Sequence, residues 1–371
     1  DRKCATIIFL SFTLVYLVAY GLEKWSTQQA ELTAVIDVRP PSLAGLATSG
    51  SRMILPKQKR FLLFPDHDTL PHHEYLKSSE ELKNTTWVAD LHHYLMTLNR
   101  NVTPHVNLVF ADYKHRILVV NWVVAATLKV KPPLHNVLVL SLDQLLCNFL
   151  ASSMLYMNHP PDITCIAAPV DTMLSSKGDN LWRASMMIRP IILRLINYWG
   201  FDVATYDSDA VVLKNPQTLF EKYTHDILSS ASMWPDSQAE PWGFTLCAGA
   251  ILYRATSATE TFWRYLSNVT GRADQVSLNK ALKNLNISWK ETTKVSQVCS
   301  TDGWEGEADG GLRVYVFPQR LFCRRKCCSR FREGVYVVHP GGHHGDAGAK
   351  SDSLAWVNAW FVSVVTITNR S

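Results

Sequence analysis

Charged residues are scarce in this 371-residue chain: Asp, Glu, Lys and Arg make up only 19% of it, and apolar residues make up 47%. This composition excludes disorder over most of the length, because disordered chains are poor in apolar residues and rich in charge. The chain also lacks a large excess of positive charge, because its formal net charge is only +5. This excess is too small to indicate a nucleic acid as the main partner. A mean hydropathy of −0.03 excludes several membrane spans but allows one.

Long apolar runs are lacking except at the start, where residues 5–22 form one uncharged segment long enough to cross a bilayer. Arg2 and Lys3 precede it, so the positive-inside rule favours a cytoplasmic tail at 1–4 and a luminal remainder. We therefore predict an uncleaved signal anchor over 5–22. The alternative is a signal peptide with its small-x-small cleavage sequence at 19–21. Both interpretations send the rest of the chain through the secretory pathway.

Asn-x-Ser/Thr sequons agree with that destination. Five are present, beginning at Asn84, Asn101, Asn268, Asn286 and Asn369. Single matches are common by chance, but five in a chain that carries an export segment support exposure to the lumen. We predict N-glycans at the first four of these asparagines.

Paired C-x-x-C spacing, the usual sign of a zinc site, is also missing. Cys4 belongs to the predicted cytoplasmic tail, which leaves seven luminal cysteines. The group Cys299, Cys323, Cys327 and Cys328 could in principle bind zinc. An oxidising lumen favours disulfides instead, with one cysteine left over and the connectivity open.

After the predicted anchor, residues 23–83 form an irregular stem, in which Pro, Gly and basic residues interrupt any helix or strand pattern. From 84 to 371 short β-rich runs alternate with helical segments, as expected for one luminal catalytic domain. The predicted strands are 106–110, 137–142, 163–167, 201–206, 227–232, 249–253, 314–317 and 335–338. The predicted helices include 115–129 and an apolar stripe from Ile188 to Trp199 that ends at Gly200. This alternation predicts an α/β fold with a mixed, mostly parallel central sheet, in which ligands bind beyond the carboxyl ends of strands.

Two carboxylates, Asp207 and Asp209, directly follow the predicted strand 201–206. Carboxylates two residues apart in extended backbone point the same way and can share Mn²⁺ or Mg²⁺, with substrate phosphates as further ligands. The bare pattern is weak, because Asp66 and Asp68 match it too, within the stem, where we interpret them as a solvated turn. The alternative for Asp207 and Asp209 is also an Asp-rich turn.

Further candidate groups follow two later segments. His339 ends the last predicted strand and begins a Gly-rich stretch that reaches Lys350. Imidazole is a suitable third ligand for Mn²⁺, and a Lys can neutralise a diphosphate. The alternative is a flexible His-rich loop. Asp274 and Gln275 open a predicted helix, where Asp274 either caps the helix or, with Gln275, hydrogen-bonds a sugar.

Residues 200–216 resemble the core of the nucleotide-diphospho-sugar transferase family, which includes plant rhamnogalacturonan xylosyltransferases and extensin arabinosyltransferases. Matches at 247–254, at 274–279 and at His339, Gly345 and Lys350 support the resemblance. It implies a GT-A fold and a type II Golgi membrane glycosyltransferase. It also implies Mn²⁺, a nucleotide-sugar donor such as a UDP-sugar, a glycan or glycoprotein acceptor, and retention of anomeric configuration.

The same resemblance assigns roles to individual residues. Asp207, Asp209 and His339 would hold the metal, and Asp207 and Lys350 would contact the donor diphosphate. Donor contacts are also expected from Ala111, Asp112 and Tyr113 near the base, from Asn121, and from Gly249, where sugar or acceptor comes close. Catalytic roles are expected for Arg189, Asp274 and Gln275. One departure is Pro340-Gly341-Gly342, where the family commonly has Asn or a similar polar residue after the His.

A covalent nucleophile is not evident in the sequence. The resemblance implies front-face attack, in which the leaving phosphate helps to deprotonate the acceptor hydroxyl while the metal and Lys350 stabilise the departing charge. The alternative from another class is a catalytically inactive GT-A-fold Golgi protein that binds a glycan or partner. A hydrolase would need a poised acid–base carboxylate pair, and no spacing indicates one.

Overall fold

The computed structural model describes residues 85–98, 105–154, 160–169, 181–239, 241–267, 274–290, 299, 302–324, 327–328, 334–340 and 347–362. All of them belong to one compact unit, residues 62–371. The predicted anchor at 5–22, the stem at 23–83 with Asp66 and Asp68, and the predicted glycan sites other than Asn286 lie outside the described residues. Within the described ranges, no helix combines the length and apolar character that a membrane span requires.

A nine-stranded sheet forms the centre, in the order β3-β2-β1-β4-β7-β6-β10-β9-β8. Its strands are β1 (His105–Ala111), β2 (Val137–Ser141), β3 (Ile163–Ala167), β4 (Asp202–Tyr206), β6 (Ile227–Ser232), β7 (Thr245–Tyr253), β8 (Ser288–Lys290), β9 (Trp304–Ala308) and β10 (Leu312–Phe317). A smaller sheet has the order β11 (Phe322–Arg324), β12 (Val337–His339), β5 (Val211–Val212). The predicted α/β fold is therefore confirmed.

The expectation of a mostly parallel sheet holds for only one half. Strands β3, β2, β1 and β4 are parallel, whereas β7 runs antiparallel to both β4 and β6. Of the eight pairings in the described sheet, four are parallel and four antiparallel. The β8–β9 hairpin was not predicted, because β9 has too few apolar residues: Glu305 and Glu307 point outward between buried Trp304, Gly306 and Ala308.

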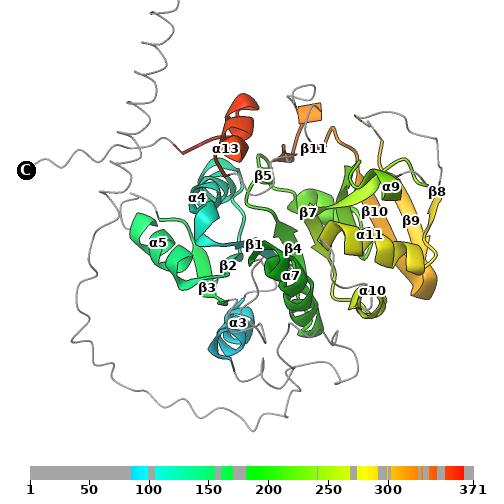
Figure 1. The fold of residues 1–371 in the computed structure, drawn as a ribbon, viewed down its shortest axis with the longest axis horizontal. Helices are drawn as coiled ribbons and strands as arrows, with labels where there is room; N and C mark the ends of the chain where they lie inside the picture. The colour runs from blue at the N-terminus through cyan, green and yellow to red at the C-terminus, as the bar shows by residue number, and fades with distance from the viewer. Residues whose placement is uncertain are drawn as a thin grey trace, which may run out of the picture. The chain divides into compact units, whose positions relative to one another are not determined.

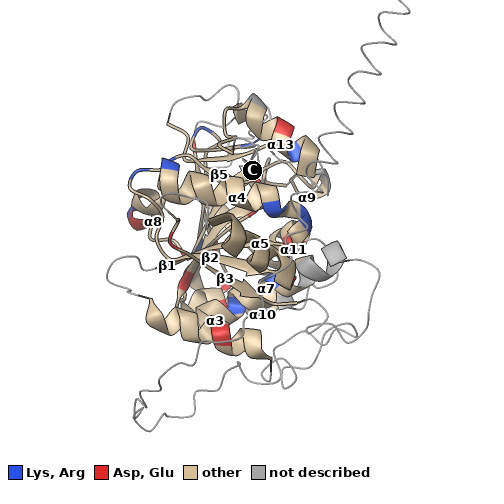
Figure 2. Ribbon diagram, turned by 90° about the vertical axis from the view of Figure 1, so that its left-hand side faces the viewer, with Lys and Arg blue, Asp and Glu red and all other residues tan. Residues whose placement is uncertain are grey.

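Helices cover both faces of this sheet (Figure 1). One face packs against α3 (Thr86–Thr97), α7 (Leu181–Tyr198), α10 (Ser257–Ser267) and α11 (Asp274–Asn284). The other packs against α4 (Arg116–Val124), α5 (Gln144–Met154) and α8 (Gln217–Lys222). Strand β1 shows the alternation: Val106 and Leu108 enter the first core, and Val109 and Ala111 enter the second. Charged residues are few along the described ribbon (Figure 2), in keeping with the composition.

Shorter helical turns connect these layers, namely η2 (Tyr113–His115), η3 (Ala125–Lys129), α9 (Asp236–Ala239) and η4 (Asp309–Gly311). Helix α13 (Ala347–Trp356) packs near α4. The predicted helix 115–129 is thus one α-helix flanked by a 3-10 turn and a π turn.

Helix α7 matches its predicted pattern. The stripe Ile188, Ile191, Ile192, Leu195 and Ile196 is buried against the sheet. Gly200 ends the segment with φ +79°, a left-handed conformation that glycine adopts without strain. Strand β4 begins two residues later. This tight connection places Arg189, which follows the first residue of the stripe, within reach of the carboxyl end of β4.

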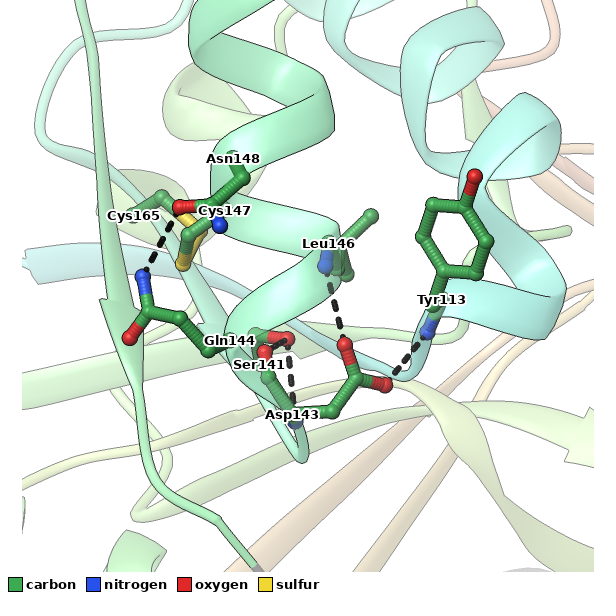
Figure 3. The surroundings of a disulfide bond; sticks show 8 residues. All are labelled: Tyr113, Ser141, Asp143, Gln144, Leu146, Cys147, Asn148 and Cys165. Atoms are coloured by element: carbon green, nitrogen blue, oxygen red, sulfur yellow. Dashed lines mark hydrogen bonds between the residues drawn. A yellow bond between two sulfur atoms is a disulfide. The ribbon is translucent and has the colours of Figure 1, made fainter. Parts of the chain in front are cut away.

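Disulfides join six of the seven predicted luminal cysteines: Cys147–Cys165, Cys299–Cys327 and Cys323–Cys328. The first ties α5 to β3 (Figure 3). Cys247 is the cysteine left over, buried with a free thiol. The expectation of disulfides with one unpaired cysteine is confirmed. The zinc alternative fails, because all four cysteines of that group are in disulfides.

A buried histidine makes the stability of the fold sensitive to acid. Burial lowers the pKa of His105 to about 4, from an ordinary value of 6.5. The unfolded chain therefore takes up a proton below about pH 6.5 that the native state refuses until about pH 4. Wild type should thus lose about 2 kcal/mol more unfolding free energy than His105→Asn between roughly pH 7 and pH 5. Urea denaturation measures this difference. His93→Asn, at an exposed site on α3, is the control and should behave like wild type.

Candidate active site

The site is built where β4 ends. The Asp207 amide donates to the Gly249 carbonyl at 2.9 Å, and the Ala210 amide donates back to the Asp207 carbonyl at 2.8 Å. This turn leads into β5, which pairs antiparallel with β12, with Val338 opposite Val211. The pairing carries His339, the last residue of β12, back to the two carboxylates although more than a hundred residues separate them in sequence.

Asp207, Asp209 and His339 form one cluster whose ligand atoms all lie within 4.8 Å of one another. His339 Nε2 is 3.5 Å from Asp207 Oδ2 and 3.6 Å from Asp209 Oδ1. Both Asp209 oxygens are buried, and neither accepts a well-aligned hydrogen bond. Lys350 Nζ lies 3.1 Å from Asp209 Oδ2 and forms an ion pair with it. Burying a carboxylate is costly, and a hard divalent cation would bind its oxygens, so the residues fit Mn²⁺ or Mg²⁺.

The electrostatics keep both carboxylates ionised. Burial alone would raise the pKa of Asp209, but His339 and Lys350 outweigh it and hold that pKa far below its usual range. Burial likewise opposes ionisation of Asp207, and Arg189 and His339 bring its pKa below the usual value. Burial lowers the pKa of His339, but the neighbouring Cys247 and Asp209 raise it overall to about 9. Without a metal, His339 and Lys350 supply the positive charge that balances the two carboxylates, and a divalent cation would take the place of the proton on the imidazole.

Arg189 bridges the two acidic segments and is almost fully buried. Its Nη1 donates to Asp207 Oδ1 at 2.7 Å and to Asp274 Oδ2 at 3.1 Å. Its Nη2 donates to the Thr205 hydroxyl and the Ala248 carbonyl, both at 3.1 Å. Two of these contacts are to carboxylates and two are to strands β4 and β7, so Arg189 is placed to orient Asp207 and Asp274.

Asp274 and Gln275 begin α11, as predicted. Asp274 Oδ1 accepts a hydrogen bond from the Gln275 amide at 2.6 Å, at the start of the helix. Oδ2 instead accepts from Arg189, so only one of the two oxygens contacts the first turn of the helix. Burial raises the pKa of Asp274 despite the opposing charge of Arg189. The Gln275 side chain donates to Ser232 Oγ and to the Trp234 carbonyl and accepts the Ala248 amide. Gln275 is 5% exposed, whereas the Asp274 side chain is 16% exposed, so Asp274 is the better placed of the two to contact a bound molecule.

Gly249 leaves the space that the imidazole fills. A Cβ at this position would lie 2.1 Å from His339 Cε1 and 2.7 Å from Asp207 Oδ2. The sequence predicted that Gly249 admits sugar or acceptor, whereas the structure shows that its missing side chain admits the metal-ligand candidates themselves.

Gly249→Ala should therefore displace His339 or Asp207. We expect turnover to fall about 100-fold and stability to fall by about 1–3 kcal/mol from overpacking. Initial rates and urea denaturation measure the two effects. Gly306→Ala on β9 is the matched control, because its Cβ would lie 2.6 Å from the Trp289 ring on β8, and neither residue belongs to the cluster. It should cost stability while keeping the rate, and equal rates for both variants would refute the packing argument.

A family model described as nucleotide-diphospho-sugar transferase matches residues 133–354, more than half of the chain and the part that carries the cluster. The chain belongs to this family. It is accordingly a glycosyltransferase.

Solved structures with related folds accompany that match. Galactosyltransferase LgtC, in complex with donor and acceptor sugar analogues, is 13% identical with a TM-score of 0.37, covering 70% of this chain and 97% of that one. Mouse xyloside xylosyltransferase 1 is 12% identical with a TM-score of 0.40, covering 65% and 99%. The bifunctional glycosyltransferase WbbM is 12% identical with a TM-score of 0.42, and the chain spans 51% of its length. No curated protein matches the chain significantly.

The predicted base-binding residues of the glycosyltransferase lie at the carboxyl end of β1, the strand next to β4. Ala111 is buried at the strand end. Asp112 Oδ1 lies 2.6 Å from His115 Nδ1, and the Tyr113 amide donates to Asp143 Oδ2 at 2.7 Å (Figure 3). Burial would raise the pKa of Asp112, but the hydrogen bond and charge of His115 lower it overall. These contacts fix the turn in place at the same edge of the sheet as Asp207.

Asn121 has a different role from the predicted donor contact. It is fully buried in α4. Its amide donates to the Ala359 carbonyl at 3.0 Å, and its oxygen accepts the Phe361 amide at 2.6 Å. The side chain thus binds the segment after α13 to the core. We correct the prediction accordingly: Asn121 is a structural residue.

Sequence reasoning missed two neighbours of the glycosyltransferase site, Cys247 and Arg324. Cys247 Sγ lies 3.5 Å from His339 Nδ1, and Arg324 Nη1 donates to the same sulfur. Cys247 lies in the segment 247–254, which matches the family but carries no pattern that marks a metal-site neighbour. Arg324 lies opposite His339 because of the register between β11 and β12, and no local sequence pattern indicates that register.

Proposed function

We propose that this glycosyltransferase moves a sugar from a nucleotide-diphosphate sugar, a UDP-sugar in the first instance, to a glycan or glycoprotein. The reaction depends on Mn²⁺ or Mg²⁺ and retains the anomeric configuration. The observation that carries the proposal is the Asp207–Asp209–His339 cluster at the carboxyl end of β4. Asp209 and His339 are buried in it, Asp207 is partly exposed, and both Asp209 oxygens lack an aligned donor. Such a cluster suits a cation that is shared with phosphate oxygens.

Asp207, Asp209 and His339 would hold the cation, which when bound neutralises charge developing on the leaving diphosphate. Lys350 is the second source of positive charge. Lys350 lies in α13, and its ammonium is 3.1 Å from Asp209 Oδ2. Its side chain is about one-fifth exposed, so it can turn toward the phosphate oxygens of a bound donor. Arg189 keeps Asp207 and Asp274 oriented during the reaction.

Retention would proceed by front-face attack. Asp274 is the acidic side chain beyond the metal candidates that approaches the cluster, and its two oxygens are engaged by Arg189 and by the Gln275 amide. A carboxylate held this way is suited to orient a sugar hydroxyl rather than to form a covalent bond. The acceptor hydroxyl would lose its proton to the leaving phosphate.

We also propose that the enzyme is a type II Golgi membrane protein anchored by residues 5–22. Three disulfides in the described region support an oxidising compartment. Asn286 is the one predicted glycan site within the described ranges, and it is exposed after α11. Its side chain donates to Asp309 at 2.6 Å, a contact that a glycan would replace. A mobility shift on endoglycosidase treatment of the secretory-pathway protein tests this placement.

The test of function is release of nucleoside diphosphate by the full chain in mild detergent, from a panel of donor sugars with and without Mn²⁺. We expect turnover of at least one donor, abolished by chelation and restored by Mn²⁺. No turnover of any donor, with any metal or acceptor, would overturn the proposal in favour of a non-catalytic protein that binds a glycan or a partner.

A further inference from the structure

Three strands bring Cys247, Arg324 and His339 together behind the metal-ligand candidates. Cys247 lies on β7 with no measurable exposure, and His339 on β12 is 6% exposed. Arg324 on β11 is the register partner of His339. The thiol sulfur meets both neighbours, since it lies 3.5 Å from His339 Nδ1 and accepts from Arg324 Nη1. His339 belongs both to this group and to the cluster with Asp207 and Asp209.

The two nitrogens of His339 face opposite ways. Nε2 points at Asp207 Oδ2 and Asp209 Oδ1, at 3.5 and 3.6 Å. Nδ1 points at Cys247 Sγ, its hydrogen-bond partner among the described residues. A histidine binds a metal well when one nitrogen carries the lone pair and the other donates to a fixed acceptor. The geometry gives the sulfur the position of that acceptor.

Arg324 determines what the sulfur can offer. A guanidinium has five donors and no acceptor, so its contact with Cys247 uses the sulfur as an electron-rich acceptor. The Nδ1–H of His339 can donate to that same atom. Gly249, two residues along β7 and on the same face, leaves the space in which the ring lies. Cys247 and Gly249 therefore define the plane and the direction of the imidazole.

We propose that Cys247 is the positioning residue of His339. It accepts the Nδ1–H, with Arg324 holding the sulfur, and so aims Nε2 at the cation shared by Asp207 and Asp209. This inference rests on the proposed function, because it assumes that the cluster binds a divalent cation. It explains why a free thiol is kept beside three disulfides: a Cys247 paired with another cysteine would be turned away from the ring.

The test is Mn²⁺ affinity, measured by electron paramagnetic resonance on the full chain in the presence of UDP. Cys247→Val fills the site with a slightly larger apolar side chain that lacks an acceptor, and Cys247→Ala lacks both the acceptor and the volume. Each should weaken Mn²⁺ binding roughly 10- to 100-fold. Cys247→Ser retains an acceptor and should stay within about tenfold of wild type. Ser229→Ala is the matched control, because it removes one buried atom that contacts the Cys247 carbonyl and not His339.

A second readout follows the ring itself. In Mg²⁺-loaded protein labelled with ¹⁵N-histidine, the resonances of His339 are identified as those missing from His339→Asn. They should show a protonated Nδ1 in wild type and in Cys247→Ser, and an altered Nδ1 resonance in Cys247→Val. Wild-type Mn²⁺ affinity in the Val and Ala variants would overturn the inference alone. Equally weak binding by the Ser and Val variants would also overturn it. A wild-type protein that binds no Mn²⁺ would overturn both the inference and the proposed function.

Discussion

Asp209→Asn should lower sugar transfer by about 10²- to 10³-fold while the chain stays folded. Asn has nearly the same shape as Asp, but it replaces one oxygen by an NH₂ group and removes the charge. Asp209 is the most buried member of the cluster, and its oxygens have no aligned donor. In the Asn variant, a cation bound by the cluster would therefore lose the Asp209 carboxylate, the ligand that is most buried from water. Initial rates of nucleoside diphosphate release, with Mn²⁺ varied, measure the loss.

Asp226→Asn is the matched control for that substitution. Asp226 is also buried, but its oxygens accept the Thr256 hydroxyl at 2.9 Å and the Arg313 amide at 2.8 Å. This variant should lose about 1–3 kcal/mol of stability and keep a near wild-type rate. A wild-type rate for Asp209→Asn, in a protein of wild-type melting temperature, would show that Asp209 holds no catalytic cation.

Arg189→Gln should destabilise the fold by about 3–5 kcal/mol, because the buried guanidinium is the shared counter-charge of two partly buried carboxylates. Asp207 retains His339 as a neighbour, whereas Asp274 loses the cation nearest to it. The pKa of Asp274 is already raised by burial and would rise further without Arg189. The variant can then relieve the unpaired charge by taking up a proton, so its deficit relative to wild type should shrink between about pH 8 and pH 5.

Arg194→Gln provides the comparison on the same helix. Arg194 is buried and pairs with Glu260 at 2.6 Å, on the side of α7 away from the cluster. Both variants should lose stability in urea denaturation, but only Arg189→Gln should lose turnover and bind Mn²⁺ more weakly. A loss for Arg189→Gln that is the same at both pH values would contradict the charge argument and leave only a packing role.

The carboxylate pair could be predicted because the information is local. A helical stripe, a glycine stop, a buried strand and Asp207 follow one another without interruption, and each step has its own pattern. His339 was predictable for the same reason, as the end of a β-rich run. The expectation of disulfides with one unpaired cysteine could be predicted from the oxidising lumen and the odd number of cysteines, but the sequence did not indicate which cysteines pair.

Contacts between distant segments could not be predicted. Arg324 meets His339 only through the register of two three-residue strands, and Cys247 reaches them from a third. Asn121 has the residue type expected for a donor contact, yet it binds the backbone after α13, 238 residues further on. Strand β9 was missed because it places glutamates at its outward positions, which removes the apolar run that marks a buried strand. The antiparallel direction of β7 could not be predicted, because it depends on pairing with β4 and β6 and not on a local pattern.

The most direct test of the cluster is an Mn²⁺ titration of the wild-type chain with UDP, followed by electron paramagnetic resonance. If Asp207, Asp209 and His339 form the metal and diphosphate site, one Mn²⁺ should bind per chain, UDP should tighten the binding, and Asp209→Asn should abolish it. No saturable binding by the wild type, or unchanged binding by Asp209→Asn, would contradict the assignment.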